Sequence, residues 1–225
     1  MKTILIASSK KWFLKNKEFL KFIKKRKIIT ISDKKKLNFK NLNKIRPDII
    51  FFPHWSFKVN KNIIKKFNCI CFHTSPLPYG RGGSPIQNLI LKKFKIAPVC
   101  ALKMTNKIDS GPIYLKENIS LSGNLDEIFN RISLKILKMI KILIRRKVKP
   151  KKQVGRIFNF KRLKNHHSKI TKNETTNQIY DKIRMLSSDD YPHAYILKDN
   201  LKIFLKNPEL KKKVIYCEAK IIKNK

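Results

Sequence analysis

Short, continuously apolar segments alternate with amphipathic segments through the first half of the chain, and this alternation constrains the fold most strongly. A strand whose side chains are all apolar is buried on both faces, as happens when helices cover a parallel sheet. The expected strands are Thr3–Ala7, Lys27–Ile31, Asp48–Pro53 and Asn68–His73, and the expected helices between them are Trp12–Ile23, Asn41–Ile45 and Val59–Phe67. The pattern predicts an α/β fold with a Rossmann-like, mostly parallel sheet and helices on both faces.

The pattern changes after His73. Segment Thr74–Pro85 holds three prolines and three glycines, which predicts a shaped loop without regular structure. Regular elements are expected to resume as a helix over Ile86–Leu91, strands over Pro98–Thr105 and Pro112–Leu121, and a long helix over Leu125–Ile144.

Pro150-Lys151-Lys152 is typical of a linker, so we expect one catalytic domain over residues 1–150 and a small C-terminal extension over residues 151–225. In the extension the periodicity predicts a helix over Thr176–Leu186. Short strands are expected at Tyr195–Leu197, Leu201–Leu205 and Lys213–Tyr216, which makes the extension α+β.

The net charge of +40 would ordinarily indicate a nucleic-acid or membrane partner. Here nine arginines stand among 54 basic residues, and the lysines are spread over almost every segment. Surfaces that read phosphates and bases favour arginine and concentrate charge on one face. We therefore attribute the charge mainly to a lysine-rich composition and expect no nucleic-acid partner.

The N-terminal apolar run is too short for a signal peptide, and no run approaches the length of a membrane span, so a cytoplasmic protein is expected. Cys69 and Cys71 lie two apart within an apolar run, and no CxxC pair occurs. We expect buried thiols and no metal site.

Two segments have the composition of a reaction centre. His73 ends a buried strand, where open α/β sheets bind ligands, and the loop behind it carries Arg81 between glycines as an anion clamp. Asp109 lies in a Gly-containing turn between two apolar strands. Each residue alone is more typical of structure than of catalysis. Together, an imidazole that ionises near neutral pH and a carboxylate that stabilises its cation suit proton removal from an amine.

The spacing His73-x-Ser75-x-Leu77-Pro78-x-x-Arg81-Gly82-x-x-Pro85-Ile86-Gln87, followed by Ile108-Asp109-Ser110-Gly111-Pro112, closely resembles the formyltransferase family. The resemblance covers residues 47–135, continues more faintly at Phe160-Lys161-Arg162 and Ile179–Pro192, and implies formyl transfer from 10-formyltetrahydrofolate, as a co-substrate, to a primary amine. It places His73 and Asp109 beside the formyl carbon. The family's asparagine two residues before the histidine is Cys71 here, so its role in polarising the formyl oxygen is filled from elsewhere or lost.

The resemblance also implies two binding surfaces. The expected folate site comprises Pro53, His54, Trp55, Ser75, Leu77, Thr105 and Ile108, although Trp55 is equally typical of a core residue. The expected acceptor site comprises Arg81, Gly82, Gly83, Gln87, Arg162, Tyr180, Arg184 and Tyr191, although Arg184 also suits a helix anchor and the tyrosines suit a core.

The acceptor predicted by this resemblance is a nucleotide-linked amino sugar, as in pseudaminic-type nonulosonic acid biosynthesis. Methionyl-tRNA and glycinamide ribonucleotide are the alternatives, and the chain after residue 150 is short for the barrel domain of methionyl-tRNA formyltransferases. A non-catalytic, basic nucleic-acid-binding relative of the fold is a further alternative. A homodimer is compatible with the sequence.

Overall fold

The structure is a computed structural model that describes residues 2–24 and 28–223. Two compact units share the chain, and both are discontinuous. The first comprises the residues up to Arg81 with Pro98–Asn118 and Ile132–Phe158, and the second comprises Gly82–Ala97, Ile119–Arg131 and the residues from Asn159 onward. The domain boundary expected at residue 150 stays a prediction.

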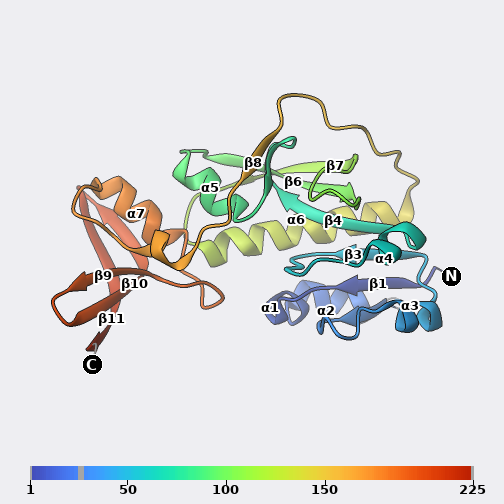
Figure 1. Cartoon of the computed structure of the whole chain (residues 1–225), viewed down its shortest axis with the longest axis horizontal. Helices are drawn as coiled ribbons and strands as arrows, with labels where there is room; N and C mark the ends of the chain where they lie inside the picture. The colour runs from blue at the N-terminus through green and yellow to red at the C-terminus, as the bar shows by residue number, and fades with distance from the viewer. Residues whose placement is uncertain (1, 25–27, 224–225) are drawn as a thin grey trace. The chain divides into compact units, whose positions relative to one another are not determined.

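The first unit is built on a six-stranded sheet of order β2-β1-β3-β4-β6-β7 (Figure 1). Pairs β1–β2, β1–β3 and β3–β4 are parallel, and β4 pairs antiparallel with β6. The strands are β1 (Ile4–Ala7), β2 (Ile28–Ile31), β3 (Ile49–Phe52), β4 (Cys69–Thr74), β6 (Ile96–Lys103) and β7 (Ile113–Ser120). The predicted mostly parallel α/β fold is confirmed, while Lys27 at the start of the second predicted strand lies outside the described residues.

Helices alternate with these strands as α1 (Lys11–Leu14), α2 (Lys17–Lys24), α3 (Phe39–Ile45), α4 (Lys61–Lys66) and, after β7, α6 (Leu125–Arg145). The prediction of one continuous helix over Trp12–Ile23 is wrong, because the segment forms two helices, α1 and α2. The side-chain Oδ1 of Asn16 accepts hydrogen bonds from the backbone N–H groups of Glu18 (2.9 Å) and Phe19 (3.3 Å), which starts a new helix there.

The core of the first unit consists of the continuously apolar strands. Leu5, Ile50, Phe51 and Ile70 are each at most 1% exposed, so these strands are covered on both faces. Burial of this kind fixes strand register, and register fixes which side chains of β4 share a face.

The segment predicted to lack regular structure contains a short strand. Strand β5 (Tyr79–Gly82) pairs with β8 (Phe158–Phe160) in a two-stranded sheet. Positive φ values of 84° at Gly80 and 97° at Gly82 let the backbone twist where a side chain would be strained. The prediction of a loop without regular structure is therefore wrong for Tyr79–Gly82, where the glycines allow a bent strand.

The second unit contains α5 (Pro85–Leu91), the short 3₁₀ helix η1 (Asn165–Ser168), α7 (Thr176–Arg184) and an antiparallel sheet of order β11-β10-β9. Its strands are β9 (Ala194–Lys198), β10 (Leu201–Lys211) and β11 (Val214–Lys223), all three longer than predicted. Helix α7 begins with a capping box between Thr175 and Gln178. Figure 1 shows α7 and the strands β9, β10 and β11 in orange and red, and these elements confirm the expected C-terminal α+β extension of the fold.

Candidate active site

The imidazole of His73 lies near the end of β4 and is 8% exposed. Its Nδ1 is 3.3 Å from Oδ2 of Asp109, and its Nε2 is 2.7 Å from the carbonyl oxygen of Gly80. Both ring nitrogens therefore face oxygen acceptors. A neutral ring donates at one nitrogen and can take up a proton at the other, after which the carboxylate stabilises the cation.

Asp109 reaches His73 from a tight turn between β6 and β7. Its own φ is 48°, a left-handed conformation that aspartate and asparagine tolerate better than most residues. The hydroxyls of Thr105 and Ser110 lie 2.9 Å apart and both donate to the Lys107 carbonyl. A Cβ added to Gly111 would stand 1.7 Å from the carbonyl oxygen of Lys103, so only glycine lets the turn fold back onto β6.

Cys71 shares the sheet face of His73, because side chains two residues apart in a strand point the same way. Burial raises the pKa of its thiol, and the nearby negative charge of Asp109 raises it further. The thiol is therefore protonated at neutral pH. It is a weak hydrogen-bond donor there and not a thiolate nucleophile.

The loop behind His73 is held from inside. Ser75 is fully buried and its hydroxyl donates to the carbonyls of Tyr79 (2.7 Å) and Gly80 (3.0 Å). Leu77 is 3% exposed and packs with Cys100 and Leu102. These two residues, predicted to contact folate, shape the loop that positions the Gly80 carbonyl against His73.

One residue at this site was missed by sequence reasoning. Oε1 of Gln153 accepts hydrogen bonds from Nε and Nη2 of Arg81 at 3.0 and 2.7 Å. Its Nε2 donates to the carbonyls of Asp109 and Gly111, both at 2.8 Å. Gln153 lies in a lysine-rich stretch that is typical of a linker, so the sequence around it gives no sign that its side chain bonds to the site.

The remaining residues expected at the folate site fall into two groups. Pro53, His54 and Trp55 follow the end of β3, where the ring of His54 packs 4.8 Å from that of Trp12. Thr105 and Ile108 lie in the Asp109 turn, and Ile108 is 73% exposed. Trp55 after β3, Cys71 in β4 and Met104 after β6 all pack against the same core cluster. Both groups of expected folate residues therefore adjoin this cluster.

Apart from Arg81, the residues expected to bind the acceptor belong to the second unit. A Cβ on Gly82 would lie 2.8 Å from the Phe160 carbonyl oxygen, and one on Gly83 would lie 2.7 Å from Cβ of Arg162. Close packing on the 160–162 segment thus explains both glycines. Arg162 itself is exposed.

Gln87 and Tyr191 are taken up by packing within the second unit. Gln87 is 2% exposed and donates to the Met185 carbonyl at 3.3 Å. Tyr191 packs 5.7 Å from the Phe129 ring, and burial raises the pKa of its hydroxyl. Both contacts suit structural roles better than acceptor binding.

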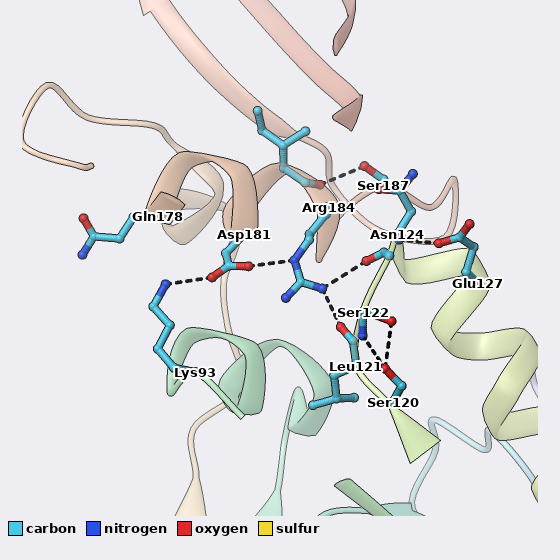
Figure 2. Close-up of polar contacts among 12 residues, drawn as sticks. Lys93, Ser120, Leu121, Ser122, Asn124, Glu127, Gln178, Asp181, Arg184 and Ser187 are labelled. Carbon is cyan, nitrogen blue, oxygen red and sulfur yellow. Dashed lines mark hydrogen bonds and ion pairs between the residues drawn. The ribbon is translucent and has the colours of Figure 1, made fainter. Parts of the chain in front are cut away.

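Arg184 anchors α7 within the second unit, as Figure 2 shows. Its Nε donates to Oδ1 of Asp181 at 2.7 Å, and its Nη1 donates to the carbonyls of Leu121 (2.6 Å) and Gly123 (3.0 Å). Oδ2 of Asp181 is 2.8 Å from Nζ of Lys93. The Arg184 side chain is 11% exposed, and Tyr180 lies 5.8 Å from its guanidinium. The contacts favour the anchoring interpretation of Arg184 over acceptor binding.

Replacing Arg184 by methionine should lower the free energy of unfolding by about 3 kcal/mol, because Asp181 and two carbonyls lose a buried charged partner. Urea denaturation measures this loss. Arg162→Met, which removes an exposed arginine of the same unit, is the control and should change stability by less than about 0.5 kcal/mol. Equal stability of the two variants would contradict the anchoring role.

Over residues 2–24 and 28–223, no three His, Cys, Asp or Glu side chains gather as metal ligands would. The same residues include no helix long and apolar enough to cross a membrane.

One solved structure matches the chain over its full length. The methionyl-tRNA formyltransferase from Clostridium thermocellum superimposes with a TM-score of 0.96 at 36% sequence identity, and 100% of each chain is covered. The chain belongs to the formyltransferase family. Residues 165–222 also match the family described as methionyl-tRNA formyltransferase, C-terminal domain.

Other relatives match a smaller share of the chain or match it at lower sequence identity. The methionyl-tRNA formyltransferase of Rickettsia typhi is 38% identical over 94 residues, which are 40% of this chain and 31% of that enzyme. The chain thus spans about a third of the curated relatives it matches first. A sugar N-formyltransferase from a Shewanella species superimposes with a TM-score of 0.69 at 19% identity, over 94% of this chain and 100% of that one, which shows the shared fold alone.

Proposed function

We propose that this formyltransferase transfers the formyl group of 10-formyltetrahydrofolate to the amino group of methionyl-tRNA. The observation that carries the reaction type is the 3.3 Å contact between the His73 imidazole and the Asp109 carboxylate at the strand end. It gives an amine nucleophile a base and gives the resulting cation a partner.

In the proposed reaction the amine nitrogen bonds to the formyl carbon, and the bond from that carbon to N10 of the folate breaks. His73 takes the proton that the amine loses and returns it to the departing N10. Asp109 keeps the imidazole in the right orientation and stabilises its charged form. The protein contributes no covalent intermediate, since the Cys71 thiol, whose pKa is raised, stays protonated.

The region around β3 and the Asp109 turn suits a folate. The indole N–H of Trp55 is buried and has no hydrogen-bond partner in the described part of the chain, so a ligand acceptor would satisfy it. Ile108, 73% exposed beside Asp109, offers apolar surface to an aromatic ring. We propose that Pro53, Trp55, Thr105 and Ile108 hold the folate and that it brings the formyl carbon to His73.

Two observations favour methionyl-tRNA over the amino sugar that the sequence first suggested. The relative at 36% identity and full coverage is a methionyl-tRNA formyltransferase, whereas the sugar enzyme is 19% identical. The net charge of +40, which we attributed above mainly to a lysine-rich composition, would also attract a polyanionic acceptor such as tRNA, so this proposal reverses the expectation of no nucleic-acid partner. The amino sugar stays a prediction that this comparison does not favour.

Direct competition tests the acceptor. The full chain is incubated with labelled 10-formyltetrahydrofolate and equal concentrations of methionyl-tRNA, glycinamide ribonucleotide and a nucleotide-linked 4-amino sugar. We expect the label on methionyl-tRNA, with a KM that rises steeply with salt because phosphate contacts are screened. Label on the sugar would reject the tRNA assignment and keep formyl transfer.

Cys71→Asn should raise kcat about tenfold, because a side-chain amide donates a stronger hydrogen bond than a thiol to the oxygen that gains charge. Cys71→Ser is the matched control, with a small polar group and shorter reach, and should stay near the wild-type rate. Steady-state kinetics with saturating folate separates kcat from KM. A lower rate in Cys71→Asn would mean that another group already fills this role.

A further inference from the structure

Gln153 uses both ends of its amide at the candidate site. Its oxygen accepts two hydrogen bonds from Arg81, and its nitrogen donates two to the backbone of the Asp109 turn. Four bonds from one side chain are unusual for a segment whose neighbours are exposed. From Lys151 to Asn159 Gln153 is the one residue that is partly buried.

The segment that carries Gln153 is fixed to the sheet just before it. The backbone N–H of Lys151 donates to the Ile113 carbonyl at 2.9 Å, and the N–H of Ile113 donates to the Lys151 carbonyl at 2.7 Å. This bridge at the start of β7 fixes the position of the backbone two residues before Gln153. A chain fixed in this way can support a neighbouring turn.

The two carbonyls that accept hydrogen bonds from Gln153 belong to the turn that carries the catalytic carboxylate. They belong to Asp109 itself and to Gly111, which lies against β6. The left-handed backbone of Asp109, with a φ of 48°, decides where its side chain points. The amide of Gln153 therefore acts on the residue whose orientation sets the 3.3 Å contact with His73.

We propose that Gln153 is a positioning residue that holds the Asp109 turn against His73 and ties it to Arg81. The proposal rests on the proposed function and deepens it, since it adds a residue that acts through Asp109 without touching the reacting atoms. Misplacement of a catalytic group by about 1 Å can cost about a hundredfold in rate. Gln153 is partly exposed, so water can replace its hydrogen bonds with little loss of stability.

Three variants of the full chain separate the two halves of this contact. Gln153→Leu removes all four hydrogen bonds, and Gln153→Glu keeps the acceptor for Arg81 but turns an oxygen toward both turn carbonyls. Both should lower kcat by about 10- to 100-fold with KM for folate changed less than about threefold. Lys152→Ala, an exposed neighbour, should keep wild-type values. Wild-type kcat in Gln153→Glu would overturn the proposal.

A double-mutant cycle then shows whether Gln153 acts through Asp109. In an Asp109→Asn background Gln153→Leu should cost less than about threefold, because the carboxylate it positions is already gone. If the two losses multiply fully, Gln153 acts independently of Asp109 and the positioning role is wrong.

A readout that needs no turnover completes the test. The imidazole ¹H–¹⁵N resonances of His73 should move in Gln153→Leu and stay in place in Lys152→Ala, as the Asp109 oxygen leaves Nδ1. Unchanged resonances would overturn the proposal. If the wild type formylates no acceptor, the proposed function fails by itself, while the resonances still decide whether Gln153 positions Asp109.

Discussion

Replacing His73 by alanine is expected to lower kcat/KM for formyl transfer about a thousandfold while the protein still binds folate. The amine must lose a proton as it attacks, and a positioned base contributes about 10²- to 10⁴-fold to such a step. The imidazole is held between the Gly80 carbonyl and Asp109, so no water molecule takes its place in the same orientation. Steady-state kinetics and folate titration by fluorescence measure the two effects.

His166→Ala is the control, because His166 is an exposed histidine of the second unit. It should keep wild-type turnover and folate affinity. Loss of folate binding in His73→Ala, with turnover of the residual complex unchanged, would give His73 a binding role and contradict its use as the base.

Asp109→Asn should lower kcat by about a hundredfold or more with little change in stability. Asparagine tolerates the left-handed φ of 48°, so the turn should survive. Its amide nitrogen, turned toward Nδ1 of His73, would donate to the ring nitrogen that has to take up the proton, and its oxygen carries no charge to stabilise the imidazolium. Thermal unfolding and kcat, measured on the same preparation, separate fold from function.

Asp199→Asn gives the matched control. Asp199 also has a left-handed φ, of 50°, and its side chain is 80% exposed in a turn. The same chemical change there should leave kcat at the wild-type value. A kcat for Asp109→Asn within about threefold of the wild type would remove the carboxylate from the mechanism.

The sheet could be predicted from the sequence because its strands are apolar on both faces. β3 and β4 appear within one residue of their expected ends. The proximity of His73 and Asp109 was also expected, because the family resemblance places both residues beside the formyl carbon. Local patterns and a family spacing carried both predictions.

The details that failed depend on contacts between distant residues. The helix break at Asn16 follows from a side-chain cap, and β5 forms inside the Pro/Gly loop because β8 pairs with it. Gln153 lies 44 residues from Asp109 in a lysine-rich stretch. Arg184 donates hydrogen bonds to carbonyls that lie 61 and 63 residues away in the sequence. Periodicity does not encode such contacts.

Single-turnover transfer with the wild type tests the central claim most directly. The full chain is loaded with 10-formyltetrahydrofolate that carries label in the formyl group and mixed with methionyl-tRNA, and the label is followed in folate, protein and RNA. We predict that it passes from folate to the methionyl amine in one phase, without label on the protein at any time. Label on the protein, or none on the RNA while the folate stays intact, would contradict direct transfer by His73 and Asp109.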